Sequence, residues 1–478
     1  MSQTNSKDSE ENNEDDEWHK FSNAGYSSAS VDSDAEIDKN VNDNQSGVWF
    51  DGDDFEFEGK TLDWNSPPCP TPLGVAHVIK IGTCNHCIER VSGKKNMSGE
   101  EIRSEAHVRD GTLDKSFETI LCPLCENLFD DIGNIVNRIV DKISNLEYST
   151  IQIGIHLPKD LINDEDEIRS RHGATGSRPL KSAMVVAIQN EININLGTDV
   201  NFVKEKPDLM VLIDGLTLRV DVDVRPIYFY GRYRKLSREI PQTRWPCRAC
   251  KGRARGCESC NESGLQYLDS VQDLVGEPVR SALDAEDTSF HGMGREDIDV
   301  RMLGKGRPFI IEIKKPMSRI PDLEKLVNTI NDNADGKVEI DSLKRTDRSL
   351  IAKIKASRSE KSYTIRFKVS GEIIEEEVIS HISDISGVVL NQETPQRVSH
   401  RRAAKIRKRK VTYLGNIIIE GDEIQFDVRC EAGTYVKELV HSDEGRTIPS
   451  VSGKIGMDCE ILWLDVTEIH DDEENQDN

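Results

Sequence analysis

Four Cys-x-x-Cys pairs constrain this chain more than any other feature of its sequence. They hold eight of its eleven cysteines and fall into two sets. The two pairs of the first set are separated by 34 residues, and those of the second set by six. The first set is Cys84, Cys87, Cys122 and Cys125, and the second set is Cys247, Cys250, Cys257 and Cys260.

Such pairs are typical of metal binding, because each one supplies two thiolates from a single tight turn. Two pairs provide the four soft ligands that a tetrahedral zinc ion takes. The pattern predicts one or two structural zinc sites, since four thiolates leave no coordination position open for a substrate. Unrelated buried or redox thiols remain the alternative, more so for the first set, whose pairs are joined by a long loop.

The charge of the chain is unevenly distributed. Lys and Arg number 62 and Asp and Glu number 86, which gives a formal net charge of −24. Residues 1–60 hold 17 acidic and 4 basic side chains, and six more carboxylates follow Val466. We expect residues 1–64 to form a disordered acidic arm and residues 467–478 an acidic tail. The part between them is nearly neutral, so binding to nucleic acid stays open.

Two classes of protein are excluded by composition. No apolar run approaches the 18 or so residues that a membrane span needs. The first residues lack the basic and apolar regions of a signal peptide. Because the cysteines have metal-binding spacing and no export signal precedes them, we expect a cytoplasmic protein without a membrane partner.

Hydrophobic periodicity predicts a chain of the α+β class. The first globular part is expected to contain helices over 128–145 and 180–196 and strands over 149–156, 208–214 and 216–223. From about 265 to 466 the chain is expected to be rich in strands. The best candidates are 295–303, 308–314, 362–369, 372–378, 416–420, 424–430 and 458–466.

Two basic strips favour RNA as a partner. Between Gly231 and Gly256 there are nine basic residues and one acid, with aromatic residues nearby, and residues 401–410 carry seven basic residues and no acid. Basic side chains release counterions from phosphates, and aromatic rings stack on unpaired bases. Either strip alone fits a solvated surface. The candidate RNA contacts are Arg232, Arg234, Lys235, Arg401 and Arg402.

The segment 291–303 carries the candidate chemistry. With a period of two, one face of a strand would present Arg295, Asp297, Asp299 and Arg301. A turn at 304–306 would then lead into a second strand to form a hairpin. Neighbouring guanidinium groups keep carboxylates ionised, as a nucleophile or base at neutral pH requires. A surface ladder of ion pairs remains the alternative.

Four segments together resemble the archaeal tRNA pseudouridine synthases of the Pus10 family, over roughly residues 70–466. They are FYGRYRKLSREIPQTRWPC (229–247), GREDIDVRMLGKGRPFIIEIKKP (294–316), TPQRVSHRRA (394–403) and AGTYVKELVHSDEGRT (432–447). The resemblance implies a zinc-bearing accessory domain with a THUMP-type RNA-binding portion over 65–240. A zinc knuckle pair would follow over 241–264, and then a catalytic domain with a curved mixed sheet over 265–466.

The resemblance also implies which residues act. Asp297 would be the catalytic carboxylate, oriented by Arg295 or Arg301. Tyr363 would stack on the target base and Leu464 would pack on its other side. Lys437 matches a basic position of the synthase core.

The activity implied by the resemblance is isomerisation of uridine to pseudouridine at positions 54 and 55, in the T loop of tRNA. The uridine would be flipped into the cleft, without a redox or group-transfer cofactor and without an obligate protein partner. The main alternative is a non-catalytic, zinc-containing tRNA-binding or RNA-chaperone protein. A DnaJ-like chaperone or a THUMP-linked methyltransferase fits less well, because the His-Pro-Asp signature and a Gly-rich nucleotide loop are missing from the sequence.

Overall fold

The computed structural model describes residues 71–399, apart from 95, 111–120, 175 and 254, and residues 403–471. The expected acidic arm, Arg401, Arg402 and residues 472–478 lie outside the described residues. No helix within the described ranges has the length and apolar character to cross a bilayer.

The accessory part is built on a four-stranded sheet with strand order β2-β1-β3-β4. Strand β1 is parallel to β2 and to β3, and β3 is antiparallel to β4. The strands are β1 (Thr150–His156), β2 (Asn201–Phe202), β3 (Leu209–Asp214) and β4 (Val220–Val224). The helices are α2 (Thr71–Lys80), α3 (Asn85–Ser92), α4 (Gly99–Asp110), α5 (Ile132–Ile143), α6 (Lys159–His172) and α7 (Leu180–Leu196).

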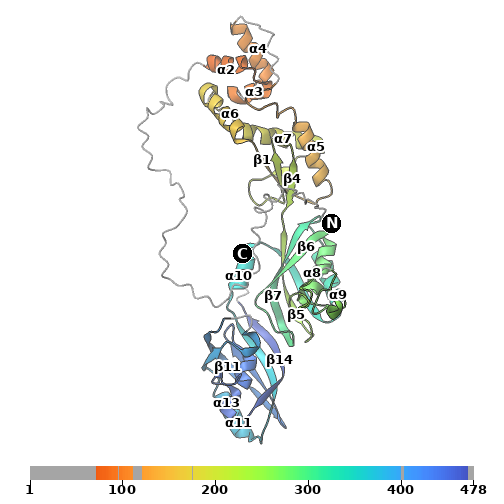
Figure 1. The fold of residues 1–478 in the computed structure, drawn as a ribbon, viewed down its shortest axis with the longest axis vertical. Helices are drawn as coiled ribbons and strands as arrows, with labels where there is room; N and C mark the ends of the chain where they lie inside the picture. The colour runs from red at the N-terminus through yellow and green to blue at the C-terminus, as the bar shows by residue number, and fades with distance from the viewer. Residues whose placement is uncertain are drawn as a thin grey trace, which may run out of the picture. The chain divides into compact units, whose positions relative to one another are not determined.

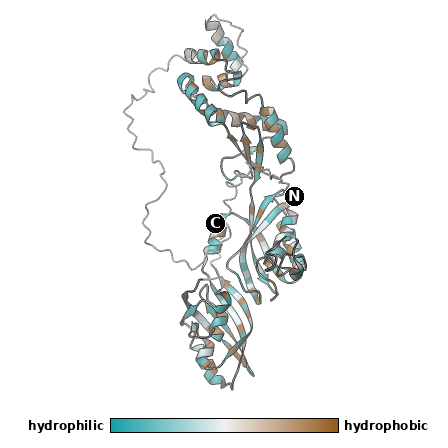
Figure 2. Ribbon diagram, viewed as in Figure 1, coloured by the Kyte–Doolittle hydropathy of each residue, from teal (hydrophilic) through white to brown (hydrophobic). Residues whose placement is uncertain are grey.

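This part follows its sequence pattern closely. Ile151, Ile153 and Ile155 alternate along β1 and are buried, as a strand with one covered face requires. Helix α5 buries Ile135 and Ile139, which are four residues apart on one helical face. Figure 2 shows the hydrophobic residues concentrated on the strands of this sheet. The expected helices and strands of this part are confirmed within a few residues at their ends.

The part expected to be catalytic (residues 227–470, the catalytic part) contains a ten-stranded sheet, in the order β13-β10-β11-β12-β9-β14-β7-β5-β8, with β6 paired to β7. Strand β14 is parallel to β7 and the other pairs are antiparallel, so the sheet is mixed as expected. Its curvature stays a prediction. The strands are β5 (Ile227–Lys235), β6 (Ala285–Gly292), β7 (Val300–Pro316), β8 (Val338–Thr346), β9 (Glu360–Val369), β10 (Val389–Glu393), β11 (Ile406–Glu420), β12 (Glu423–Cys430), β13 (Thr447–Ile448) and β14 (Cys459–His470).

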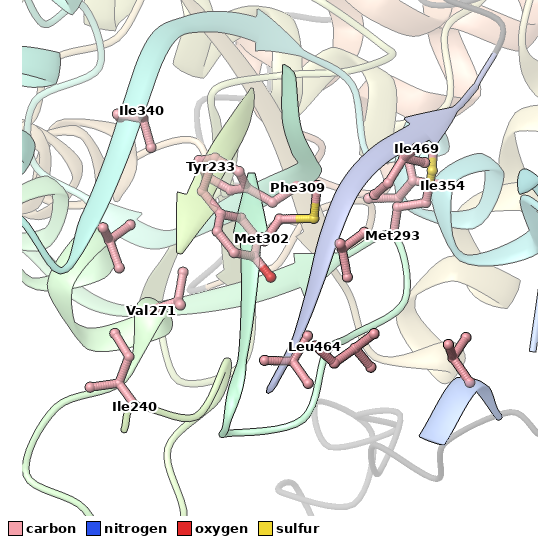
Figure 3. Close-up of a cluster of buried hydrophobic side chains, with 14 of the residues drawn as sticks. Tyr233, Ile240, Val271, Met293, Met302, Phe309, Ile340, Ile354, Leu464 and Ile469 are labelled. Atoms are coloured by element: carbon pink, nitrogen blue, oxygen red, sulfur yellow. The ribbon is translucent and has the colours of Figure 1, made fainter. Parts of the chain in front are cut away.

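Helices cover this sheet and close one hydrophobic core. They are α8 (Val271–Ala282), α9 (Leu323–Ala334), α10 (Ser349–Ala356), α11 (Glu375–Ser383), α12 (Val436–His441) and α13 (Val451–Ile455), with 3-10 turns η2 (Glu258–Cys260) and η3 (Gln396–Val398). Helices α8 and α9 lie side by side against the sheet (Figure 1). Figure 3 shows Tyr233, Met302 and Phe309 together in the core, on strands β5 and β7.

The expected strand over 372–378 is wrong, because Glu375 begins helix α11. Its first turn holds three glutamates, which the positive end of the helix dipole stabilises. Val378 and Ile382 are buried at helical spacing, one turn apart. The apolar residues at 373 and 374 had suggested a strand, but the burial of this segment has a helical period.

The expected strand over 295–303 is confirmed only from residue 300, and the expected hairpin is wrong. Residues 293–299 form a loop, and β7 then runs as one strand through the glycines at 304 and 306. Both glycines have positive φ, at 58° and 77°. A Cβ atom on Gly306 would lie 2.7 Å from the Tyr233 carbonyl oxygen. These glycines therefore allow irregular pairing within one strand where the sequence had suggested a turn.

Two domain boundaries expected from the sequence also differ in the structure. Strand β5, at 227–235, pairs with β7 and β8, so the large sheet begins before residue 240. At the other end, β14 continues to His470, and Asp471 forms an ion pair with Arg232 on β5. The first residues of the expected acidic tail are therefore part of the fold.

Candidate active site

The loop 293–299 is anchored from β7 by a buried cation. The side chain of Arg307 is 1% exposed and that of Glu296 is fully buried. Arg307 Nε donates to Glu296 Oε2 at 2.8 Å, and its Nη1 donates to the Met293 carbonyl oxygen at 2.8 Å. The backbone N–H of Met293 also donates to the Pro308 carbonyl oxygen on β7 at 2.9 Å, so a main-chain bond and buried side chains together hold the loop in place.

A second buried cation holds the end of the same loop. Lys235 Nζ donates to the carbonyl oxygens of Ile240, Asp297 and Ile298 at 2.9, 3.0 and 2.9 Å. Burial lowers the pKa of Lys235 to about 8, while the nearby Glu296 carboxylate opposes that shift. The expectation that Lys235 contacts RNA is wrong, because its side chain is fully covered.

Asp297 lies between these anchors and faces two cations from distant parts of the chain. Arg397 Nη1, on η3, lies 2.7 Å from Asp297 Oδ2. Lys437 Nζ, on α12, lies 4.0 Å from the same oxygen and 2.6 Å from Asp299 Oδ2. Glu438, which is buried beside Lys437, accepts a hydrogen bond from Arg397 Nε at 2.6 Å and so fixes that guanidinium.

The second carboxylate of the loop is held ionised by its partner. Partial burial, the largest single influence, would raise the pKa of Asp299. The hydrogen bond and the charge of Lys437, together with the Asp299 backbone amide and the charge of Arg397, outweigh burial and lower that pKa. Lys437 thus neutralises one carboxylate at close range and approaches the other. The arrangement leaves Asp297 with one direct partner, Arg397, and about a third of its side chain exposed.

A cleft of about 230 Å³ opens at this loop. Both carboxylates and both cations contribute to its wall. The lining residues are Pro241, Gln242, Thr243, Trp245, Arg295, Glu296, Asp297, Ile298, Asp299, Arg397 and Lys437. Pockets for drug-sized ligands usually measure about 300–1,000 Å³, so this cleft suits a smaller group such as one extruded base.

Tyr363 and Leu464 lie on strands next to the loop. Tyr363 on β9 is half-buried, and burial raises its pKa above the usual range. Leu464 on β14 pairs with Val300, the first residue of β7, and is 6% exposed. Neither is among the described residues that line the cleft. Their contact with a base stays a prediction.

The two arginines expected to orient Asp297 are placed differently. Arg301 Nη2 lies 2.6 Å from Asp465 Oδ2, so the expectation that it braces Asp297 is wrong. The strand that would have put both on one face begins only at residue 300. Arg295 is exposed on the cleft wall. The brace is Arg397, which sequence reasoning missed although it lies in the family-like segment TPQRVSHRRA.

Two further candidate RNA contacts are engaged within the protein. Arg232 pairs with Asp471 and donates to the carbonyl oxygens of Lys305 and Gly306. Arg234 on β5 pairs with Glu339 and with Asp341, both on β8. The basic strip around 232–235 is therefore largely structural, which disfavours the expected RNA contacts of these two arginines.

The first cysteine set forms a compact cluster in the accessory part. The four sulfur atoms lie within 4.8 Å of one another, and those of Cys84 and Cys125 are 3.7 Å apart. Sulfur atoms about 2.3 Å from a tetrahedral zinc ion lie about 3.8 Å apart. The cluster therefore fits zinc.

The second cysteine set is gathered in the same way. Its four sulfur atoms also lie within 4.8 Å, with Cys247 and Cys257 at 3.9 Å and Cys257 and Cys260 at 3.7 Å. The amides of Cys257 and Gly264 point at Cys260 Sγ, at 3.1 and 3.2 Å, as donors do around a zinc-bound thiolate. Both sets therefore fit a structural zinc ion.

Comparison with known proteins gives one consistent result. The family model described as Pus10, C-terminal, matches residues 228–470, and the archaeal Pus10 THUMP domain matches residues 135–214. The chain is 38% identical to the tRNA pseudouridine synthase Pus10 of Methanothermobacter marburgensis over 398 residues, which cover 81% of this chain and 94% of that protein. It is 39% identical to the protein of the same name from Methanothrix thermoacetophila, over 71% of this chain and 74% of that protein.

A solved Cbf5-Nop10-Gar1 complex overlaps 43% of this chain and 47% of that chain at 19% identity, with a TM-score of 0.27, too low to support an inference. The family models and the sequence identities are enough to assign the family. An α+β chain with a THUMP domain and a second domain that places a carboxylate in a cleft belongs to the broad class of RNA-modifying enzymes. The chain is a member of the Pus10 family.

Proposed function

We propose that this protein is a tRNA pseudouridine synthase that converts uridines of the T loop, at positions 54 and 55, to pseudouridine. Membership of the Pus10 family supports the reaction and the substrate class. The observation that carries the proposal for the site is the Asp297 carboxylate, which faces a cleft and is bound by Arg397 at 2.7 Å.

In the proposed reaction a uridine leaves the stack and enters the cleft, which costs a few kcal/mol of unstacking. Asp297 then acts on the ribose, either by attacking C1′ or by removing the proton at C2′. The glycosidic bond between N1 and C1′ breaks, and the freed uracil turns. A new bond joins C5 to C1′ as the Asp297–C1′ bond breaks or, in the other version, as the proton returns to C2′. C5 gives up its proton while N1 gains one, so the product is an isomer of the substrate.

The surroundings of Asp297 suit this role. Two cations lie beside its carboxylate, Arg397 at 2.7 Å and Lys437 at 4.0 Å, and both versions of the step use that carboxylate. Neither cation encloses the carboxylate, so an oxygen remains available to the ribose. Tyr363 is the proposed stacking partner of the base and Leu464 its apolar support, while Arg295 is the proposed contact on the cleft wall.

Other parts of the chain are assigned supporting roles. The THUMP domain and the arginines at 401 and 402 are proposed to contact tRNA outside the cleft. Each cysteine set is proposed to hold one zinc ion, which when bound supplies folding free energy on the order of 10 kcal/mol to a small module. A tRNA substrate places the enzyme in the cytoplasm, and no redox or group-transfer cofactor is needed.

The direct test uses an unmodified tRNA transcript and the full-length protein. After incubation, pseudouridine is mapped at each nucleotide by carbodiimide reaction and primer extension. We expect stops at positions 54 and 55 and nowhere else. Conversion outside the T loop would overturn the assigned positions.

The same samples distinguish the main alternative. If the protein shifts the mobility of tRNA but leaves no carbodiimide-reactive nucleotide, a non-catalytic RNA-binding function replaces the enzyme. A transcript with its T-loop uridines changed to cytidine is the matched control, because it retains the polyanionic surface and removes the reacting bases. It should bind with similar affinity and give no stops.

A further inference from the structure

A buried polar network lies directly beneath the loop that carries Asp297. Its centre is the Glu296–Arg307 pair, and two neutral groups complete it. The Tyr233 hydroxyl lies 3.0 Å from both carboxylate oxygens of Glu296 and donates to one of them. Gln242 Nε2 donates to that hydroxyl oxygen at 2.8 Å and to the Gly294 carbonyl oxygen at 2.9 Å.

The network fixes the loop at three points within four residues. Arg307 binds the carbonyl of Met293, Gln242 binds the carbonyl of Gly294, and the side chain of Glu296 is itself the central anion. Asp297 is the next residue. The backbone on the N-terminal side of the proposed catalytic carboxylate therefore depends on side chains from β5, β7 and the segment after β5.

Stability alone is a weak explanation for this arrangement. Transfer of two charges into the interior costs several kcal/mol per ion, and an apolar cluster of similar volume is often equally stable. The surroundings are apolar, since the Tyr233 ring packs edge-on against Phe290 and Phe309. The polar groups are aimed at the loop, which is the arrangement that pre-organises a reactive group.

We propose that Tyr233, Glu296 and Arg307 form a positioning unit that holds the Asp297 loop in its productive conformation. None of the three is proposed to touch the reacting atoms. The inference rests on the proposed function for its effect on rate, but its effect on the loop can be measured without any substrate.

Tyr233→Phe is the sharpest probe of the unit, because it removes one fully buried hydroxyl and leaves the ion pair. Strand β5 offers a matched control. Tyr228 is also buried, and its hydroxyl bonds to a carboxylate, Glu312 Oε1, at 3.3 Å. Tyr228→Phe therefore removes the same kind of bond from the same strand, away from the loop.

Three quantities are measured on both variants of the full chain. Single-turnover conversion of tRNA should fall about tenfold in Tyr233→Phe, with tRNA affinity within twofold of wild type, because small misplacements of reacting groups are costly. Hydrogen exchange of the peptide spanning 293–299 should rise about tenfold in the same variant. Tyr228→Phe should remain within twofold of wild type in all three quantities.

The outcomes separate this inference from the proposed function. If Tyr233→Phe matches Tyr228→Phe in loop exchange and in rate, the unit has no positioning role and the inference is wrong. If loop exchange rises but the rate is unchanged, the loop conformation does not control the chemistry and the inference is again wrong. If wild-type protein makes no pseudouridine, the proposed function fails, while loop exchange still shows whether the network holds the loop.

Discussion

Two fully buried Arg–Glu pairs support the two kinds of site in this chain. In the accessory part Arg90 pairs with Glu165, with side chains 1% and 2% exposed, and in the catalytic part Arg307 pairs with Glu296. Arg90 also donates from Nε to Cys87 Sγ at 3.4 Å and from Nη2 to the Leu124 carbonyl oxygen at 3.2 Å.

The two pairs use the same chemistry for different purposes. The Arg90 pair touches a cysteine of the first cluster, where a cation offsets the negative charge of four thiolates around a divalent ion. The Arg307 pair touches the backbone before a reactive carboxylate. The comparison teaches that each buried ion pair holds an irregular segment in place. One segment carries cysteines of a proposed zinc site, and the other carries Asp297.

Loss of either arginine should have the largest effect and should separate the two roles. Arg307→Met leaves the buried Glu296 carboxylate without a cation, which costs about 3–5 kcal/mol of unfolding free energy. Arg90→Met should cost less, because Glu165 retains its ion pair with Arg169 at 3.2 Å. We expect Arg90→Met to lose one zinc per chain and Arg307→Met to retain both while its conversion rate falls about 100-fold. Urea unfolding, metal analysis and single-turnover assays measure these three quantities.

Double variants provide the control for charge burial. Arg90→Met with Glu165→Met, and Arg307→Met with Glu296→Met, remove both charges and should recover most of the lost stability. The functional losses should remain, because the contacts to Cys87 and Met293 are still missing. Recovery of metal content or of rate along with stability would contradict the assigned roles.

Lys235 supplies a second, smaller test of the loop. Lys235→Met leaves three carbonyl oxygens without their buried donor, two of them in the loop. We expect the single-turnover rate to fall about tenfold and zinc content to stay unchanged. Lys337→Met is the control, since that amine pairs with Asp269 at a half-exposed site. An equal loss of rate in both variants would contradict a role of Lys235 in holding the loop.

Titration of Lys235 should change the conversion rate and the unfolding free energy in opposite directions. The folded chain releases the Lys235 proton near pH 8, whereas an unfolded lysine keeps it to about 10.4. Between these values the unfolded state binds more protons, so the Lys235 contribution to unfolding free energy rises with pH. The rate should fall over the same range, because the loop loses a donor.

The comparison of wild type with Lys235→Met isolates this titration. The charged groups that face the amine are Glu296, Asp297, Asp299 and Arg307, and they are common to both proteins. The stability difference between the proteins should be flat below pH 8 and should change in favour of wild type above it. A stability difference that changes in favour of Lys235→Met above pH 8 would contradict the lowered pKa of Lys235.

Arg234 should give the smallest effect. Its ion pairs with Glu339 and Asp341 are partly exposed, and such pairs contribute about 0–1 kcal/mol. We expect Arg234→Ala to change tRNA affinity less than twofold, because the guanidinium is already engaged. A tenfold loss, measured by gel shift at fixed salt, would restore the RNA contact that the sequence had suggested.

The sequence predicted the elements whose burial is periodic. Strand β1 and helix α5 each have one buried face, so their apolar residues recur with the period of a strand or of a helix. Such a period can be recognised in the sequence without knowledge of distant contacts. The cysteine clusters were also predictable, because the spacing of the Cys-x-x-Cys pairs along the chain identifies their members.

The site was predicted only in part, because its geometry depends on contacts between distant residues. Segment 295–301 alternates like a strand, but Lys235 binds its carbonyls at Asp297 and Ile298 and Arg307 binds the Glu296 side chain, and these contacts hold a loop. As a result, Arg301 on β7 pairs with Asp465. Asp297 pairs instead with Arg397, which lies a hundred residues further along the chain. No local pattern specifies such a partner.

The most direct test of the account compares the two carboxylates of the loop. Asp297→Asn and Asp299→Asn make the same change two residues apart on one cleft wall. Single-turnover conversion of unmodified tRNA should be lost in Asp297→Asn, with tRNA affinity retained, and Asp299→Asn should keep measurable conversion. Full activity in Asp297→Asn, or its loss in Asp299→Asn alone, would contradict the claim that Asp297 carries the chemistry.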